Sequence, residues 1–222
     1  MSTCYYLSWF NDLLPEKLAR CLHEDIQDRK SLVMISGEPS VSTDEPTRID
    51  DVTECAWLKQ AGLIFDEYHF IDCRMPKEEA RRFVRDASVV FLCGGDPVSQ
   101  NEFLTDYELS DVIKSSGAVI MGASAGSLNM AAKWSSSIEN GREVAAGTVY
   151  EGLGFHHFAY ESHAKRDYAS FVQGYLFPLS EEIEVYAAEQ ESAIRVKDGK
   201  IDVIGPTYLI SRAKIQKLIE TL

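Results

Sequence analysis

Residues 119–127 read Val-Ile-Met-Gly-Ala-Ser-Ala-Gly-Ser, and they are the part of the sequence that says most about the fold. A short apolar run leads into Gly122-Ala123-Ser124-Ala125-Gly126, and a helix-compatible segment follows over residues 127–132. This order is the nucleophile-elbow pattern, in which a sharp strand-to-helix turn projects a serine hydroxyl above the edge of a sheet. Glycines flank such a turn because they have no Cβ atom to clash. The stretch therefore predicts that Ser124 attacks a carbonyl group.

The motif Gly-x-Ser-x-Gly is not decisive by itself. At average residue frequencies it arises by chance in roughly one chain in ten of this length. The alternative interpretation is a loop rich in glycine and serine that merely follows a strand. The remainder of the sequence has to distinguish a catalytic serine from such a loop.

The composition is that of an ordinary globular protein and restricts the kinds of partner. The chain has 222 residues, 45% of them hydrophobic and 26% charged. No apolar run reaches the roughly 20 residues of a membrane span, and residues 1–7 lack the basic leader and apolar stretch of a secretory signal. The formal net charge of −13 argues against nucleic acids and anionic membranes, which both need a basic surface. We expect a cytoplasmic protein that binds neither.

The cysteines predict no metal site and no disulfide framework. There are five, an odd number, and no pair has the spacing Cys-x-x-Cys. This usage fits a reducing cytoplasm, and we expect no metal and no other cofactor. Cys93 precedes Gly94-Gly95, but it is expected to be a small apolar residue at the end of a strand.

Strand and helix patterns alternate through the first half of the chain. Apolar strand candidates cover residues 4–9, 31–35, 64–71, 89–93 and 118–121. Helical spacing and helix stop signals predict helices over residues 15–26, 49–61, 76–85 and 102–115. The alternation predicts an α/β fold with a doubly wound, mostly parallel sheet that is flanked by helices.

The second half has a different pattern. Residues 134–163 show short strands and turns, and residues 166–177 show helical spacing. Antiparallel strands are predicted over 184–188, 192–196 and 201–204, with Asp198-Gly199 as a turn signal, followed by a closing helix over 212–222. Because no repeat, low-complexity tract or linker divides the chain, we expect residues 1–222 to form a single domain.

Two glycine-containing segments should meet at one edge of the sheet. Gly94-Gly95-Asp96 and Gly122-Ala123-Ser124 each lie just after a predicted strand. In a doubly wound sheet, ligands bind beyond the carboxyl ends of the strands. This convergence favours the catalytic interpretation of Ser124.

A serine nucleophile needs a neighbouring base, which is usually histidine. Of the five histidines, His23 lies in a polar helix and His69 in a strand that precedes the site, so both are expected to be surface or core residues. His156, His157 and His163 lie downstream of the elbow, in irregular sequence that could return to the same edge. The residues alone do not choose among these three.

Four stretches together resemble the peptidase E/cyanophycinase family of serine peptidases, which has a fold similar to that of class I glutamine amidotransferases. They span residues from about 90 to 205. The N-terminal half agrees with the family in its pattern of strands and helices but has no equally specific motif. The stretches are Gly94-Gly95-Asp96-Pro97 with Gln100, Gly122-Ala123-Ser124-Ala125-Gly126-Ser127, Gly152-Leu153-Gly154 with His163, and Ala193-Ile194-Arg195-Val196 to Ile204-Gly205.

The resemblance implies which residues complete the catalytic group. It assigns the base to His163, although the aromatic residue that usually follows this histidine is replaced by Ala164. The acid that would orient the imidazole is expected at Glu139, fifteen residues after Ser124, with Glu143 and Glu161 as alternatives. For Glu139, the alternative interpretation is a solvated carboxylate in a turn.

An oxyanion hole needs two backbone N–H groups aimed at the developing negative charge. The residue after the nucleophile, Ala125, is one candidate, and Gly95 on the neighbouring loop is the other. A phosphate-binding turn is the alternative role for Gly94-Gly95. That role would favour a longer Gly-x-Gly-x-x-Gly or a Gly-Lys-Ser/Thr ending, and the sequence has neither.

The resemblance also implies a substrate, namely short peptides cleaved after an N-terminal aspartate. Arg166 is the expected partner of the aspartate carboxylate, because arginine can donate two hydrogen bonds to it. Lys133 and Lys165 are weaker candidates that are expected to form surface salt bridges instead. A homodimer is a further expectation, by resemblance alone.

Three other functions remain as alternatives. An α/β-hydrolase esterase shares the order of catalytic residues, but its acid and histidine usually lie much farther downstream than His163 does. A glutamine amidotransferase needs cysteine where this chain has Ser124. A peptidase-like binding or regulatory protein with a degenerate site would be favoured if His163 could not reach Ser124.

Overall fold

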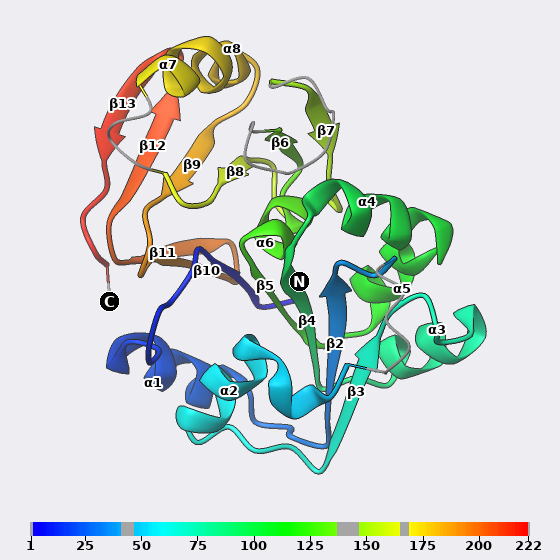
Figure 1. The fold of residues 1–222 in the computed structure, drawn as a ribbon. Helices are drawn as coiled ribbons and strands as arrows, with labels where there is room; N and C mark the ends of the chain where they lie inside the picture. Colours follow the sequence, from blue (N-terminus) through cyan, green and yellow to red (C-terminus); the bar gives the residue numbers. More distant parts are fainter. Residues whose placement is uncertain (1, 41–46, 137–146, 165–168, 222) are drawn as a thin grey trace.

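The structure is a computed structural model that describes residues 2–40, 47–136, 147–164 and 169–221. Two sheets organise these residues, a seven-stranded sheet A and a six-stranded sheet B. In Figure 1, sheet A crosses the lower and central part of the view, and most of sheet B stands at the upper left.

Sheet A has a parallel centre and an antiparallel edge. Its order is β11-β10-β1-β5-β4-β2-β3, in which β1, β5, β4, β2 and β3 run parallel to one another. β10 and β11 continue the sheet antiparallel to β1. The strands are β1 (Cys4–Leu7), β2 (Ser31–Gly37), β3 (Glu67–Ile71), β4 (Val89–Gly95), β5 (Val119–Ala123), β10 (Ala193–Lys197) and β11 (Lys200–Ile204). The expected α/β class with a mostly parallel sheet is confirmed.

Helices cover both faces of sheet A, which explains why the strands at its centre, β1, β5, β4 and β2, are buried along nearly all of their length. Successive side chains of a strand point to opposite faces, so Tyr6 enters one core and Tyr5 the other. One face packs against α3 (Lys77–Arg85), α4 (Pro97–Asp106), α5 (Leu109–Ser115) and α6 (Ala125–Met130). The other face packs against α1 (Glu16–Asp25) and α2 (Thr53–Gln60), which follows the short 3₁₀ helix η1 (Ile49–Asp51).

Sheet B is mixed and forms a smaller core of its own. Its order is β13-β12-β9-β8-β6-β7, with β8 parallel to both β6 and β9 and the other pairs antiparallel. The strands are β6 (Lys133–Ser135), β7 (Val149–Glu151), β8 (Ala159–Glu161), β9 (Val185–Ala188), β12 (Thr207–Ser211) and β13 (Lys214–Lys217). A helical segment covers one face of it, made of α7 (Ala169–Phe171), the π-helix η3 (Val172–Leu176) and α8 (Phe177–Ser180).

Two sequence-based expectations about the elements are wrong. The closing helix expected over residues 212–222 is absent from the described part of that range. Arg212 and Ala213 instead adopt left-handed backbone conformations, with φ of 49° and 54°, and turn the chain between β12 and β13. The helix expected over 102–115 is divided into α4 and α5, because Glu108 has a φ of 53° that interrupts it.

Among the described residues, no helix is long and apolar enough to cross a membrane.

Candidate active site

Ser124 occupies a strained turn between β5 and α6. Its φ is 48° and its ψ is −111°, a conformation that non-glycine residues adopt only when the surroundings enforce it. The Ser124 N–H donates to the carbonyl oxygens of Leu7 at 3.0 Å and Ser8 at 3.1 Å. The end of β1 therefore holds the turn in place, as the nucleophile-elbow pattern predicts.

The two glycines of the motif are required by close packing. A Cβ atom on Gly126 would lie 2.0 Å from the carbonyl oxygen of Leu92, so α6 can approach β4 only with glycine at this position. A Cβ on Gly122 would lie 2.6 Å from the carbonyl carbon of Gly126. These contacts explain the residue types on both sides of Ser124 independently of any chemistry.

The imidazole of His163 lies beside the Ser124 hydroxyl. Ser124 Oγ and His163 Nε2 are 2.8 Å apart, which is within hydrogen-bonding distance. The two residues are 39 positions apart in the chain, and His163 follows β8. Nε2 can accept the hydroxyl proton when the imidazole carries its own proton on Nδ1.

The backbone of His163 is held by the same segment that holds Ser124. His163 has a φ of 56°, and its N–H donates to the hydroxyl oxygen of Ser8 at 3.0 Å. The next residue, Ala164, donates its N–H to the carbonyl oxygen of Ala188 at 2.9 Å. Ser8 is fully buried. Its side-chain hydroxyl holds the backbone of the base, His163, and its backbone carbonyl holds the backbone of the nucleophile, Ser124.

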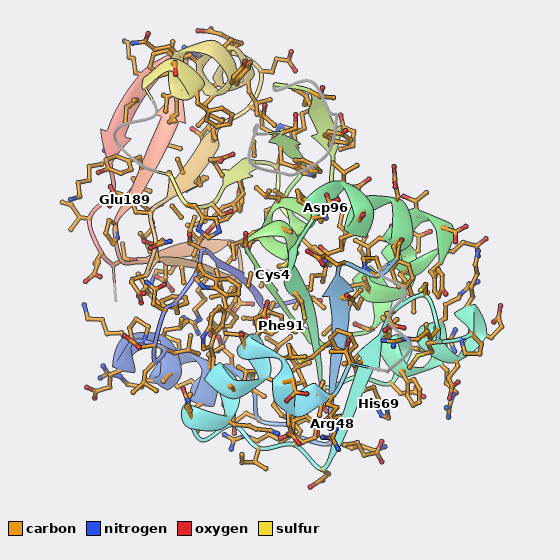
Figure 2. The ribbon with its side chains drawn as sticks, in the orientation of Figure 1. Cys4, Arg48, His69, Phe91, Asp96 and Glu189 are labelled. Atoms are coloured by element: carbon orange, nitrogen blue, oxygen red, sulfur yellow. The ribbon has the colours of Figure 1, made fainter. Side chains whose placement is uncertain are left out.

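The other four histidines make different contacts. His156 Nδ1 lies 2.9 Å from the hydroxyl of Tyr6, and burial lowers the pKa of its imidazole. His157 is exposed. His23 Nε2 lies 2.7 Å from the carbonyl oxygen of Ala61, and the ring of His69 stacks on Phe83, far from Asp96 in Figure 2. Among the three downstream histidines that the residues alone left open, the geometry thus favours His163 as the neighbour of Ser124.

The loop Gly94-Gly95-Asp96 lies at the carboxyl end of β4, the strand next to β5. The Gly94 N–H donates to Glu54 Oε1 at 2.7 Å, and the Asp96 N–H donates to the carbonyl oxygen of Gly37 at 3.1 Å. Gly95 lies between these two anchors with a φ of 143°, and a Cβ on it would lie 2.8 Å from the carbonyl carbon of Gly37. Glycine is therefore required at this position.

The Asp96 carboxylate argues against a phosphate site on this loop. It caps α4 by accepting from the N–H groups of Val98 at 2.9 Å and Ser99 at 3.3 Å. These are the donors at the helix N-terminus that a phosphate would need. Figure 2 shows Asp96 at this end of α4, above Phe91, which lies in β4.

Gln100 has a structural role beneath the loop. Its side-chain amide donates to the carbonyl oxygens of Cys93 at 2.9 Å and Ser36 at 3.2 Å, and its own oxygen accepts from Asn129 at 3.1 Å. Gln100 and Asn129 are both fully buried. The glutamine thereby ties the ends of β2 and β4 to α6, and Cys93 is a buried residue at the end of its strand, as expected.

Several expected site residues lie outside the described residues, namely Glu139, Glu143, Lys165 and Arg166. Of the alternatives for the third catalytic residue, Glu161 is described and is half-buried at the end of β8. Lys133 forms salt bridges with Glu182 at 3.1 Å and Glu151 at 3.7 Å, as expected for a surface lysine.

Two residues near the site were not predicted from the sequence. Ser8 follows an ordinary apolar strand, and Glu54 lies in the first turn of a helix, where an acidic residue is common. Neither belongs to a recognisable motif. Each acts through a contact with a residue that is distant in the sequence. Ser8 and His163 are 155 positions apart, and Glu54 and Gly94 are 40 positions apart.

Comparisons with known proteins identify the family. A model of peptidase family S51 matches residues 39–204, most of the chain and all of the segments around Ser124, Gly95 and His163. The chain belongs to peptidase family S51. It is thus a serine-type peptidase, and the resemblance found in the sequence is confirmed.

Two solved structures of peptidases have a similar fold. A peptidase from an acI-B1 Actinobacterium has a TM-score of 0.69 and 17% identity, with 100% of this chain and 96% of that chain covered. A putative peptidase E protein from Listeria monocytogenes has a TM-score of 0.64 and 15% identity, with 92% and 98% covered. A comparison with curated proteins gave no match.

Among the described residues of this S51 peptidase, no group of three or more histidine, cysteine or acidic side chains could hold a metal ion. All five cysteines are free thiols.

Proposed function

We propose that the protein hydrolyses short peptides after an N-terminal aspartate, with Ser124 as nucleophile and His163 as general base. The observation that supports this catalytic pair is the 2.8 Å distance between Ser124 Oγ and His163 Nε2 at a strained strand-to-helix turn, whereas the preference for aspartate rests on the family resemblance. A binding protein with a degenerate site would not need this contact, and an esterase is less consistent with the family.

The reaction begins with formation of an acyl-enzyme. His163 Nε2 takes the proton of the Ser124 hydroxyl as Oγ forms a bond to the carbonyl carbon, and the carbonyl electron pair moves to the oxygen. When the tetrahedral intermediate collapses, the C–N bond breaks and His163 gives its proton to the leaving amine. Water then attacks the ester, His163 again takes and returns a proton, and the acid product leaves as Ser124 is restored.

The N–H groups of Gly95 and Ala125 are proposed to stabilise the oxyanion. Ala125 is the first residue of α6, where N–H groups have no partner within the helix. The Gly95 N–H lies between the bonded N–H groups of Gly94 and Asp96, on the strand next to the nucleophile. The loss of one such donor costs about 3–4 kcal/mol in the barrier.

Two further roles rest on the family resemblance. We propose that Glu139 orients the imidazole of His163, and that Arg166 binds the carboxylate of the substrate's aspartate. Glu139 lies fifteen positions after Ser124, and Arg166 lies three positions after His163, so both are close to the site in sequence.

A panel of dipeptides tests the proposed function. Asp-X should be hydrolysed faster than Glu-X and neutral dipeptides, and Ser124→Ala should abolish the activity. Arg166→Ala should reduce the rate for Asp-X and leave neutral dipeptides unchanged. Equal rates for Asp-X and neutral dipeptides would remove the role of Arg166, and full activity in Ser124→Ala would contradict the mechanism.

A further inference from the structure

A cavity of about 250 Å³ opens beside the loop that carries Gly95. It lies at the carboxyl ends of β2, β3 and β4 and at the start of α2. Its lining includes the charged residues Glu38, Glu54, Asp72 and Arg74, together with Cys93 and Gly94 at the end of β4. Its volume lies below the roughly 300–1,000 Å³ of pockets that hold drug-sized ligands, so it suits a single amino-acid residue better than an extended peptide.

Gly94 connects this cavity to the nucleophile. A Cβ atom on Gly94 would lie 3.4 Å from Glu54 Oε1 and 3.6 Å from the carbonyl oxygen of Ala123, the residue before Ser124. β5 neighbours β4, and β2 follows on the other side of β4. Since adjacent strands are about 4.8 Å apart, the cavity begins roughly 5–10 Å from the reacting serine, within reach of one substrate residue.

The charges that line the cavity are unbalanced. Asp72 and Arg74 pair with each other, because Arg74 Nε donates to the two carboxylate oxygens at 3.1 Å and 3.0 Å and its Nη2 contacts Asp72 Oδ2. Glu38 and Glu54 are further carboxylates, and Arg74 is the single basic side chain among the lining residues that the structure describes. The cavity therefore has an excess of negative charge.

Glu54 is the buried member of this group. Only 4% of the residue is exposed, although it lines the cavity. Its carboxylate accepts the Gly94 N–H at 2.7 Å and also the backbone N–H of Glu54 itself, which together occupy part of the roughly four acceptor positions of an ionised carboxylate. Burial raises the pKa of the Glu54 carboxyl, and the bond from Gly94 acts in the opposite direction. A positive group that enters the cavity would offset the cost of this buried charge.

We propose that the cavity binds an ammonium group on the acyl side of the peptide substrate, with the Glu54 carboxylate as its partner. The inference rests on the proposed function, since it assumes that the scissile carbonyl lies at Ser124. In a peptide that begins with aspartate, the free α-amine of that residue supplies the ammonium group within this reach, and a lysine side chain could supply it only in a substrate with lysine on the acyl side. Binding of the α-amine would make the enzyme selective for the ends of peptides.

The variant Glu54→Gln separates charge from shape. The glutamine amide oxygen can still accept the Gly94 N–H, so the loop keeps its anchor while the cavity loses a negative charge. Glu78→Gln is the matched control, because it removes the same charge from an exposed position in the first turn of α3. Both variants should fold with the same circular dichroism spectrum as the wild type.

Direct binding to Ser124→Ala protein measures the cavity without catalysis. In calorimetry, alanine amide tests the α-amine, N-acetyl-lysine amide tests the side chain, and N-acetyl-alanine amide carries no positive charge. We expect at least one charged ligand to bind about tenfold more weakly after Glu54→Gln is added, with no change after Glu78→Gln. The ligand that responds identifies the source of the ammonium group.

Equal binding of the charged and neutral ligands to Ser124→Ala, or an equal loss for both upon Glu54→Gln, would overturn the proposal. Failure of the proposed function would look different. In that case Ser124 would not react with a fluorophosphonate, whereas the ammonium ligands would still bind in a manner that depends on Glu54.

Discussion

The hydroxyl oxygen of Ser8 accepts the backbone N–H of His163 at 3.0 Å. The carbonyl oxygen of Ser8 accepts the backbone N–H of Ser124 at 3.1 Å. One buried residue at the end of β1 thus ties together the two residues whose side chains meet 2.8 Å apart. Ser8 is a positioning residue in this account, because it acts on the substrate only through Ser124 and His163.

Removal of the Ser8 hydroxyl should lower kcat more than it changes KM. Ser8→Ala removes the hydroxyl that accepts the His163 N–H. The left-handed backbone conformation of His163 is then less constrained, and its imidazole can move away from Ser124. Small misplacements of catalytic groups cost about tenfold to a hundredfold in rate. Steady-state kinetics on Asp-X peptides measures the effect.

Ser88→Ala is the control for Ser8→Ala, since Ser88 lies just before β4, at the opposite end of the sheet from the site. It should leave kcat within about twofold of the wild type. If Ser8→Ala leaves kcat unchanged, or if its main effect is on KM, Ser8 does not position the base.

Gly126→Ala should destabilise the fold strongly. The added methyl would lie 2.0 Å from the carbonyl oxygen of Leu92, and neither the helix nor the strand can yield without loss of packing. Overpacking usually costs about 1–3 kcal/mol, and a clash with the backbone belongs at the upper end or beyond. Chemical denaturation followed by circular dichroism measures the free energy of unfolding.

Gly174→Ala provides the comparison for Gly126→Ala. A Cβ on Gly174 meets nothing within 4 Å, so this variant should be as stable as the wild type or slightly more stable. Equal stability of the two variants would show that the elbow does not require close approach of α6 to β4.

Asp25 should stabilise the fold at neutral pH through its buried ion pairs. Burial by itself raises the pKa of Asp25, but hydrogen bonds from Arg195, Lys197 and Tyr5 outweigh it and lower the pKa to about 2, from 3.8. Because the pKa is lowered in the folded state, this stabilisation is present above pH 3.8 and is lost as the pH falls through about 2.

Asp25→Asn should therefore be less stable than the wild type at pH 7, by on the order of 2 kcal/mol. The difference should shrink as the pH falls below 4, where the wild type loses the same charge. Denaturation curves at several pH values measure both quantities. A difference that is constant from pH 7 to pH 2 would contradict the assignment.

The first half of the fold follows from local sequence signals, for a physical reason. Strands such as β4 are buried on both faces, so they appear as continuous apolar runs, and the helices between them have clear stop signals at Gly62 and Gly117. The end of the chain lacks such signals. Arg212 and Ala213 form the turn between β12 and β13 without the glycine or asparagine that usually marks it.

The site residues also fall into two groups, those that local sequence motifs predict and those that they do not. Ser124, Gly95 and Ala125 lie in short glycine-rich motifs that can be recognised in the sequence, and close packing explains the glycine at position 95. Ser8 and Glu54 have no such motif, because each acts through a contact with a residue distant in the chain. The residues alone left His156, His157 and His163 open, and what chose among them was the family resemblance, followed by the long-range contact between Ser124 and His163.

The reaction of Ser124 with a fluorophosphonate tests the central claim most directly. Mass spectrometry of the wild type should find one equivalent of label, on the peptide that contains Ser124, and Ser124→Ala should remain unlabelled. His163→Ala should fold normally and react at least about a hundredfold more slowly, the usual loss when a general base is removed. Labelling at another residue, or an unchanged rate in His163→Ala, would contradict the assignment of Ser124 as nucleophile and His163 as its base.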